Sequence, residues 1–377
     1  MAANKNIAFL FGAGISIPAG YPSTTEISDQ IFDGYKMVRI PSGYIMRDDW
    51  QNFQTDQLEY VSRVVQFIKK LKCQFCKFYE DYYHKVNYED IYYLIDQINQ
   101  NESGNLENPI SDHFRNFIIE NWSNLFESIT DYIKVDMSTL TREALNYIED
   151  TISILLDIEP KDTSHLTLLN EVDKDKEIEL VHIFTLNHDK LIETHLSKNK
   201  LSFSEGFVLD SDNERVWDPK SFNERFRIYK LHGSLNWYQT REDSGYSSRV
   251  IQNTEVIRDS GNRLLLLIGT HNKLNEYSRG VAFELQHLFY DSLENTDRVI
   301  ISGYSFGDQG INTRLINWIF KSQQRKIILI HPDPEKLRMN TRGAINLSWD
   351  ELMRADALRI IPNYIEDVTW SDIKNLL

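Results

Sequence analysis

The chain has 377 residues, of which 41% are hydrophobic, 26% charged and 12% aromatic, a balance typical of globular proteins with a sizeable core. Its formal net charge of −15 argues against intrinsic nucleic-acid binding, because affinity for a phosphate backbone needs clustered Lys and Arg. We expect no membrane span and no signal peptide, since no apolar run has the required length or flanks. With only two cysteines, a cytoplasmic location is expected.

Seven short runs of apolar and β-branched residues predict strands. They begin near residues 6, 179, 227, 264, 297, 326 and 357. Most are continuous rather than alternating, as in strands that are buried on both faces of a parallel sheet. Helical patterns separate several of them, for example residues 281–295 before the fifth run. This alternation predicts a layered α/β fold.

The first two runs lie too far apart for a simple crossover connection. Between them, from about residue 50 to 157, apolar residues recur at helical spacing, and the polar segment 99–109 interrupts the pattern. We therefore predict a helical subdomain over residues 49–157, inserted into a core formed by residues 1–48 and 158–377. Two polar, turn-rich stretches are predicted to be surface loops or short hairpins: residues 204–223 and 240–261.

A glycine-rich bend, Gly12-Ala13-Gly14-Ile15-Ser16, follows the first predicted strand, and Ser23 with Glu26 predicts a capping box for the next helix. Glycines let the backbone approach a ligand closely, and exposed N–H groups suit a pyrophosphate. A lone glycine pair is at least as consistent with an ordinary turn. The third glycine of the dinucleotide fingerprint is missing, and the position of its acidic ribose ligand falls in a helix, which disfavours a dehydrogenase.

Polar residues also gather at three other predicted strand ends, over Thr185–Asp189, Leu231–Ser234 and Gly303–Asp308. Open parallel sheets bind ligands at the carboxyl ends of their strands. Any one of these motifs alone would be a weak signal. The four together predict a single site.

These motifs resemble those of the sirtuin-like family. GAGIS (12–16), TLNHD (185–189), KLHGS (230–234) and GYSFGD (303–308) occur in the family's order, and they are most similar to its divergent bacterial branch, which cleaves NAD in antiphage defence. The resemblance covers essentially the whole chain. It implies a Rossmann-like, mostly parallel sheet with an inserted helical module, and NAD+ as the substrate.

The chain departs from protein-deacetylating sirtuins in two places. Those enzymes hold a structural zinc with two CxxC pairs, whereas this chain has only Cys73 and Cys76, and two thiolates cannot complete a tetrahedral site. Deacetylases also carry a Pro-Asp-Phe-Arg element after the glycine loop, where this chain has Ala19–Ser23. We expect no metal, and both differences argue against binding of acyl-lysine peptides.

The resemblance also implies roles for individual residues. Asn187 and His232 would form the catalytic pair, with His232 as general base and Asn187 holding a ribose hydroxyl or the attacking water. Asp333 is explained equally well as a plain turn residue. The full set of expected cofactor-binding residues is Gly12, Ala13, Gly14, Ser16, Asp189, Gly303, Ser305 and Asp333.

The predicted function is hydrolysis of NAD+ to nicotinamide and ADP-ribose by a defence effector. A nuclease or nucleotide phosphohydrolase is an alternative, although it would need clustered carboxylates for metal ions. A non-catalytic nucleotide-sensing module is another, and a protein deacylase is disfavoured. Because no sensor domain is recognisable, we expect control by a homo-oligomer or by a separate partner, such as a HerA-type ATPase or a short Argonaute protein.

Overall fold

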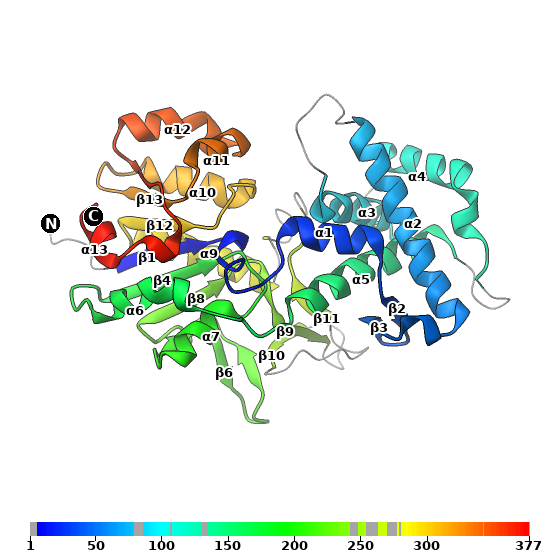
Figure 1. Cartoon of the computed structure of the whole chain (residues 1–377), viewed down its shortest axis with the longest axis horizontal. Helices are drawn as coiled ribbons and strands as arrows, with labels where there is room; N and C mark the ends of the chain where they lie inside the picture. The colour runs from blue at the N-terminus through cyan, green and yellow to red at the C-terminus, as the bar shows by residue number, and fades with distance from the viewer. Residues whose placement is uncertain are drawn as a thin grey trace.

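In a computed structural model, the chain forms an α/β core and a helical layer that lie side by side, at the left and right of Figure 1. The C-terminal helix packs within the core half of the view. The residues that the structure describes are 6–78, 86–105, 108–129, 135–241, 248–253, 263–269, 277–278, 280–341 and 343–376.

A seven-stranded parallel sheet forms the centre of the core. Its strands are β1 (Asn6–Phe11), β4 (Leu180–Thr185), β5 (Phe203–Ser204), β8 (Phe226–Lys230), β12 (Arg298–Ser302), β13 (Lys326–Ile330) and β14 (Leu358–Ile361). They lie in the order β14-β13-β12-β1-β4-β8-β5, and each pairs with its neighbours in parallel. Apart from the short edge strand β5, this is the strand order of a dinucleotide-binding sheet, so the predicted Rossmann-like fold is confirmed.

The order of the strands defines a switch point between β1 and β12. The chain moves outward from β1 to β4 and β8, and then returns to the other side of β1 to form β12. Sheets of this kind bind ligands in the crevice where the direction reverses, at the carboxyl ends of the strands. The loops that follow β1 and β12 border that crevice.

Both faces of the sheet are covered, as the continuous apolar runs predict. Ile7, Phe9 and Phe11 of β1 join one buried cluster, and Ala8 and Leu10 join the other, because successive side chains of a strand point to opposite faces. The core helices that supply the remaining layers are α6 (Thr167–Lys174), α7 (Leu191–Lys198), α9 (Gly280–Glu294), α10 (Gln309–Ile319), α11 (Pro334–Asn340), α12 (Ala344–Arg354) and α13 (Trp370–Lys374).

One predicted strand belongs to a different sheet. The run near residue 264 forms β11, which pairs antiparallel with β9 in a five-stranded sheet of order β11-β9-β10-β7-β6. An apolar run shows that a strand is buried but does not show which sheet it joins. The strands of this second sheet are β6 (Phe207–Leu209), β7 (Arg215–Trp217), β9 (Gly233–Arg241), β10 (Ser248–Gln252) and β11 (Arg263–Leu266).

The two turn-rich stretches contribute to this second sheet. Within residues 204–223, β6 and β7 pair antiparallel as a short hairpin, which agrees with the prediction. Within residues 240–261, β10 pairs with β9 and β7. The rest of that stretch, residues 242–247 and 254–261, lies outside the described residues.

The helical layer is built around α5 (Met137–Leu156). Its other elements are α1 (Thr24–Asp33), β2 (Met37–Ile40), β3 (Gly43–Met46), α2 (Thr55–Phe78), α3 (Tyr88–Glu102) and α4 (Pro109–Asn121). The predicted capping box of Ser23 and Glu26 is present at the start of α1. The helix α1 and the β2–β3 hairpin pack on α2 and α5, so the helical layer includes residues that precede residue 49. The domain boundary at residue 49 stays a prediction.

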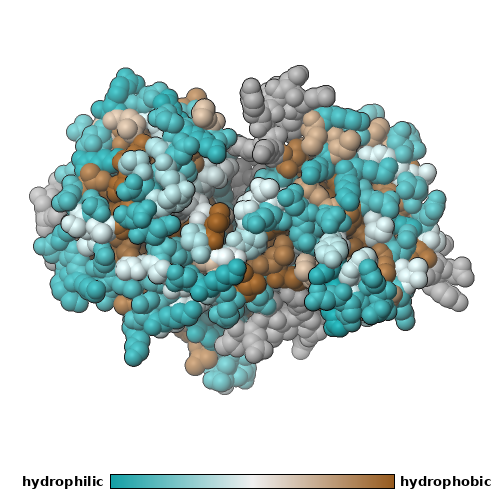
Figure 2. All heavy atoms as spheres, viewed as in Figure 1, coloured by the Kyte–Doolittle hydropathy of each residue, from teal (hydrophilic) through white to brown (hydrophobic). Residues whose placement is uncertain are grey.

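The described helices do not include one with both the length and the apolar character needed to cross a membrane. The face of the molecule drawn in Figure 2 is largely hydrophilic, with apolar residues in small separate groups. This surface fits the ordinary globular composition of the chain.

Candidate functional site

The glycine-rich bend forms a tight 3-10 turn at the carboxyl end of β1. The Gly12 N–H donates to the Ser302 carbonyl at 3.1 Å, and the Gly14 N–H donates to the Gly303 carbonyl at 2.9 Å. The N–H groups of Ile15 and Ser16 donate to carbonyls within the turn. These four donors are therefore engaged inside the protein, and they do not form the exposed row predicted for a pyrophosphate.

Close backbone approach explains the glycines at this crevice. Gly303 has a φ of +66°, and a Cβ placed there would lie 2.3 Å from the Ile15 nitrogen. A Cβ at Gly14 would lie 2.8 Å from the Gly303 Cα, and one at Gly12 would lie 2.6 Å from the Gly303 oxygen. Only glycine lets the β1 and β12 loops pack this closely. Packing alone therefore explains the glycines, and contacts of these residues with a cofactor stay a prediction.

Asn187 joins the loop after β4 to the glycine turn. Its Nδ2 donates to the Gly12 carbonyl and to Ser16 Oγ, both at 3.0 Å. Ser16 Oγ in turn donates to Asp189 Oδ2 at 2.7 Å, and all three side chains are buried. Burial raises the pKa of Asp189, while the nearby Lys230 ammonium and the hydrogen bonds from the Leu191 N–H and Ser16 Oγ oppose that shift.

Lys230, the last residue of β8, contacts the loop that follows β4. Its fully buried Nζ donates to the carbonyl of Asp189 and lies 3.5 Å from that of His188. It also forms an ion pair with Glu193 Oε1 at 2.8 Å. A buried ammonium is costly unless such partners surround it, so the contacts hold the loop that carries Asn187 in one arrangement.

His232 lies in the turn between β8 and β9, where Gly233 has a φ of +81°. Its Nε2 is 2.8 Å from the Tyr277 hydroxyl and 3.0 Å from Asp308 Oδ2. The Tyr277 hydroxyl donates to the same Asp308 oxygen at 2.7 Å. Through its other oxygen, Asp308 caps α10 by accepting the Ile311 N–H at 3.0 Å.

The four motifs close into a ring of contacts. Asn187 joins the β4 loop to the glycine turn, and Lys230 joins the β8 end to the β4 loop. Asp308 joins the β12 loop to His232, and Gly303 returns the ring to Gly14. The structure thus brings together residues from the ends of four strands into one buried polar cluster.

Two residues of the predicted cofactor set lie outside this ring. Ser305 is exposed in the loop after β12. Asp333, at the end of β13, is also exposed, and its Oδ1 accepts the Lys336 N–H at 3.0 Å as the cap of α11. Their contacts with a ligand stay predictions.

The sequence interpretation gave no role to four residues of the cluster. Lys230 and Asp308 were recognisable as the first residue of KLHGS and the last residue of GYSFGD. Tyr277 belongs to none of the motifs, and neither does His165, whose buried Nε2 donates to the Ile15 carbonyl at 2.8 Å. Burial lowers the pKa of His165, so its neutral ring supports the glycine turn.

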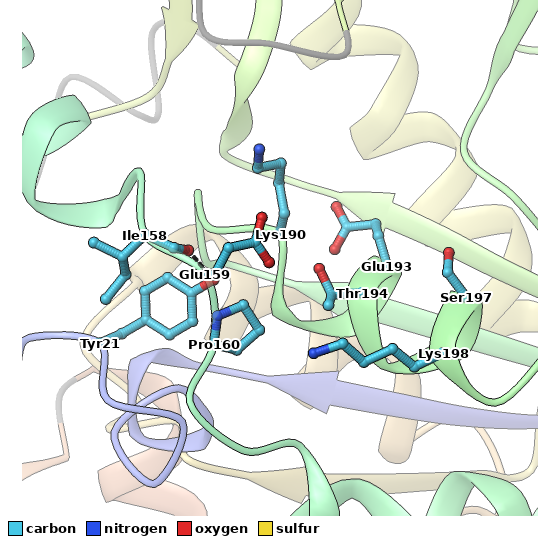
Figure 3. Close-up of a pocket in the computed structure, with 9 residues that line it drawn as sticks. All are labelled: Tyr21, Ile158, Glu159, Pro160, Lys190, Glu193, Thr194, Ser197 and Lys198. Atoms are coloured by element: carbon cyan, nitrogen blue, oxygen red, sulfur yellow. Dashed lines mark hydrogen bonds between the residues drawn. The ribbon is translucent and has the colours of Figure 1, made fainter.

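A cavity of about 270 Å³ lies beside the cluster, between Tyr21 and α7 (Figure 3). The Tyr21 hydroxyl donates to the Ile158 carbonyl at 3.2 Å, which closes one side of it. None of its lining residues belongs to the predicted site, although Glu193 is also the partner of Lys230. The lining consists of Tyr21, Ile158, Glu159, Pro160, Lys190, Glu193, Thr194, Ser197 and Lys198.

Within the described ranges, no group of three or more His, Cys, Asp or Glu side chains is arranged to hold a metal ion. Cys73 and Cys76 are exposed free thiols on α2, in the helical layer. Both lie within one continuous helix, Thr55–Phe78.

Comparison with protein families finds a similarity for part of the core. Residues 181–350, a little under half of the chain, match the family model described as SIR2-like domain. This segment is therefore similar to SIR2-like domains, and it includes Asn187, His232 and Asp308.

Solved structures of Sir2 homologues resemble the chain at low identity. A Sir2 homologue in complex with NAD is 11% identical, with a TM-score of 0.42 over 100% of this chain and 90% of that one. A point mutant of a Sir2 homologue in complex with ADP-ribose is 12% identical, with a TM-score of 0.39 over 94% and 92% of the two chains. No match was found among curated protein sequences.

Proposed function

We propose that the protein hydrolyses NAD+ to nicotinamide and ADP-ribose. The observation that carries this proposal is the ring of four motifs at the switch point of the sheet, with Asn187 and His232 buried in it. The SIR2-like match spans three of the four motifs. The ring supports a single site that handles a dinucleotide, and the lack of clustered acidic side chains in the described residues gives no support to a metal-dependent nuclease.

The side chains of the cluster can divide the chemistry between them. In hydrolysis the bond between the ribose C1′ and nicotinamide breaks with its electron pair on the nitrogen, and a water oxygen bonds to C1′. His232 would take the proton that this water releases. Asn187 can orient the water or a ribose hydroxyl, and the Asp189 carboxylate can stabilise the positive charge that develops on the ribose.

We further propose that this activity serves antiphage defence in the cytoplasm. An enzyme that depletes NAD+ harms its own cell, so it must be inactive until it is triggered. Self-assembly into a homo-oligomer or a partner such as a HerA-type ATPase or a short Argonaute protein would supply that control. Purification together with proteins encoded by neighbouring genes, followed by mass measurement, identifies the assembly.

The proposal is tested by following NAD+ and its products, with the purified protein alone and with its co-purifying partners. We expect nicotinamide and ADP-ribose to appear in equal amounts. Untouched NAD+ together with cleaved DNA would support the nuclease instead. Bound but intact NAD+ under every condition would support the sensing module, and nicotinamide release only with an acyl-lysine peptide would support a deacylase.

A further inference from the structure

We infer that Asp308 is a positioning residue that fixes His232 in the tautomer with hydrogen on Nε2. The Nδ1 atom of His232 then carries the lone pair that accepts a proton. This inference rests on the proposed hydrolysis of NAD+ for its functional meaning, and it assigns Asp308 no contact with the substrate.

The described neighbours of Nε2, Tyr277 and Asp308, favour one arrangement of hydrogens. The Tyr277 hydroxyl has a single hydrogen, which it donates to Asp308 Oδ2 at 2.7 Å. The Asp308 carboxylate accepts hydrogen bonds at both oxygens, which favours its ionised form, and in that form it has no hydrogen to give. Both neighbours therefore present oxygen lone pairs to Nε2, at 2.8 and 3.0 Å, and the contacts are favourable only when Nε2 carries the hydrogen.

Tyr277 keeps its hydrogen in this arrangement. Burial raises its pKa well above the usual value, and the charge of Asp308 adds to the shift. The phenol is therefore a permanent donor to Asp308. It shares the carboxylate oxygen with His232 and does not compete for the proton that His232 would carry.

The carboxylate of Asp308 is itself held at two points. Oδ1 accepts the Ile311 N–H as the cap of α10, and Oδ2 faces Tyr277 and His232. The N-terminus of an 11-residue helix also favours a negative charge at its cap. The start of α10 thus sets the orientation of the group that orients His232.

This geometry also serves the protonated state of His232. When Nδ1 takes a proton, the imidazolium already has a carboxylate 3.0 Å from its other nitrogen. The pairing stabilises the charge without any movement of the ring, as an aspartate does for the histidine of hydrolase triads. Asp308 therefore acts through His232.

Asp308→Asn tests this role because asparagine caps helices as well as aspartate does. When its amide oxygen caps α10, its NH2 group faces Nε2 and favours the opposite tautomer. We expect kcat to fall by roughly 10²–10⁴-fold, the range seen when a histidine is left in the wrong tautomer, while KM and the melting temperature change little. Tyr277→Phe should lower kcat less, by about tenfold or below, because the carboxylate remains.

The matched control is Asp136→Asn. Asp136 caps α5 in the helical layer by accepting the Thr139 N–H at 2.7 Å, so the same change is made at a cap that is remote from His232. This variant should keep wild-type kcat. Wild-type kcat in Asp308→Asn would overturn the inference and leave the proposed hydrolysis intact.

A second measurement does not depend on turnover or on Asp308→Asn folding. Nitrogen-15 NMR distinguishes the two imidazole tautomers, and comparison with His232→Gln assigns the His232 signals. We expect the Nε2–H form in the wild-type protein and a shift toward the Nδ1–H form in Asp308→Asn. An Nδ1–H form in the wild-type protein would contradict the inference, whereas a wild-type protein that never consumes NAD+ would contradict only the proposed function.

Discussion

The carboxyl ends of β1, β4, β8 and β12 differ from the carboxyl end of β13. At the first four ends, residues such as Asn187 and His232 are buried and bonded to partners from other strands. At the end of β13, Asp333 is exposed and bonded to its own helix. Distance from the switch point does not explain the difference, because β8 lies further from it than β13 does and still contributes His232. A polar residue at a strand end belongs to the site when neighbouring strand ends hold it in place.

The largest expected effect that tests this comparison is on turnover. His232→Ala should lower kcat by roughly 10²–10⁴-fold, because it removes the general base from the ring of motifs. The ring should still assemble through Asn187 and Lys230, so circular dichroism and NAD+ affinity should stay close to wild type. Turnover at the wild-type rate in this variant would show that the buried cluster is structural.

The next effect concerns stability at the switch point. Gly303→Ala should lower the free energy of unfolding by about 3 kcal/mol or more, because it adds a backbone clash to an unfavourable φ. Gly104→Ala is the matched control, since Gly104 has a φ of +68° but nothing within 4 Å of an added Cβ. That variant should lose only about 1 kcal/mol in urea unfolding. An equal loss of unfolding free energy in the two variants would mean that the close approach of the β1 and β12 loops does not add to the cost of the substitution at Gly303.

We expect the free energy of unfolding to depend on pH through the buried carboxyl group of Glu205. Burial, together with the charge of Glu193, raises the pKa of Glu205 from 4.5 to about 7. The unfolded carboxyl loses its proton near pH 4.5 and the folded one near pH 7, so this group destabilises the fold increasingly as pH rises through that window.

Glu205→Gln should therefore stabilise the protein above pH 7 by on the order of 2 kcal/mol, and by little at pH 4.5. Its amide oxygen can still accept from Gln252 Nε2, which lies 3.1 Å from the carboxylate. Melting temperatures at pH 8 and pH 5 measure the difference. An equal change at both values would rule out ionisation as the cause.

The smallest effect is expected at the end of β13. Asp333→Ala should cost about 1 kcal/mol of stability through loss of the α11 cap, whereas Asp333→Asn should cost much less. The two variants separate the cap from a role in binding. A several-fold rise in KM for Asp333→Asn would assign Asp333 to NAD+ binding and would extend the site beyond the four motifs.

The elements of the core were predictable where a local signal specifies them. Continuous apolar runs identify β1, β4, β8, β12, β13 and β14, and in the helical layer a capping box identifies the start of α1. The second sheet was not predictable, because β11 carries the same apolar pattern as the parallel strands. Contacts between residues far apart in the chain determine which strands pair, and the hydrophobic periodicity of a single strand does not predict its partner.

The same limit applies to the site. The motifs name Asn187 and His232, but Tyr277 and His165 occur in no motif and reach the cluster only through the fold. The donors of the glycine turn illustrate the point further. Their engagement with Ser302 and Gly303 depends on the register between β1 and β12, which local sequence does not specify.

The central position of β1 affects how the protein is made. Ala8 pairs with His182 on one side and with Val299 on the other, so the first strand to leave the ribosome waits for partners that are synthesised much later. Such distant pairings form slowly, and an unpaired strand is prone to aggregate. The glycine turn likewise meets Gly303 only after most of the chain exists. For a protein with the proposed activity, this order keeps unfinished nascent chains from consuming NAD+.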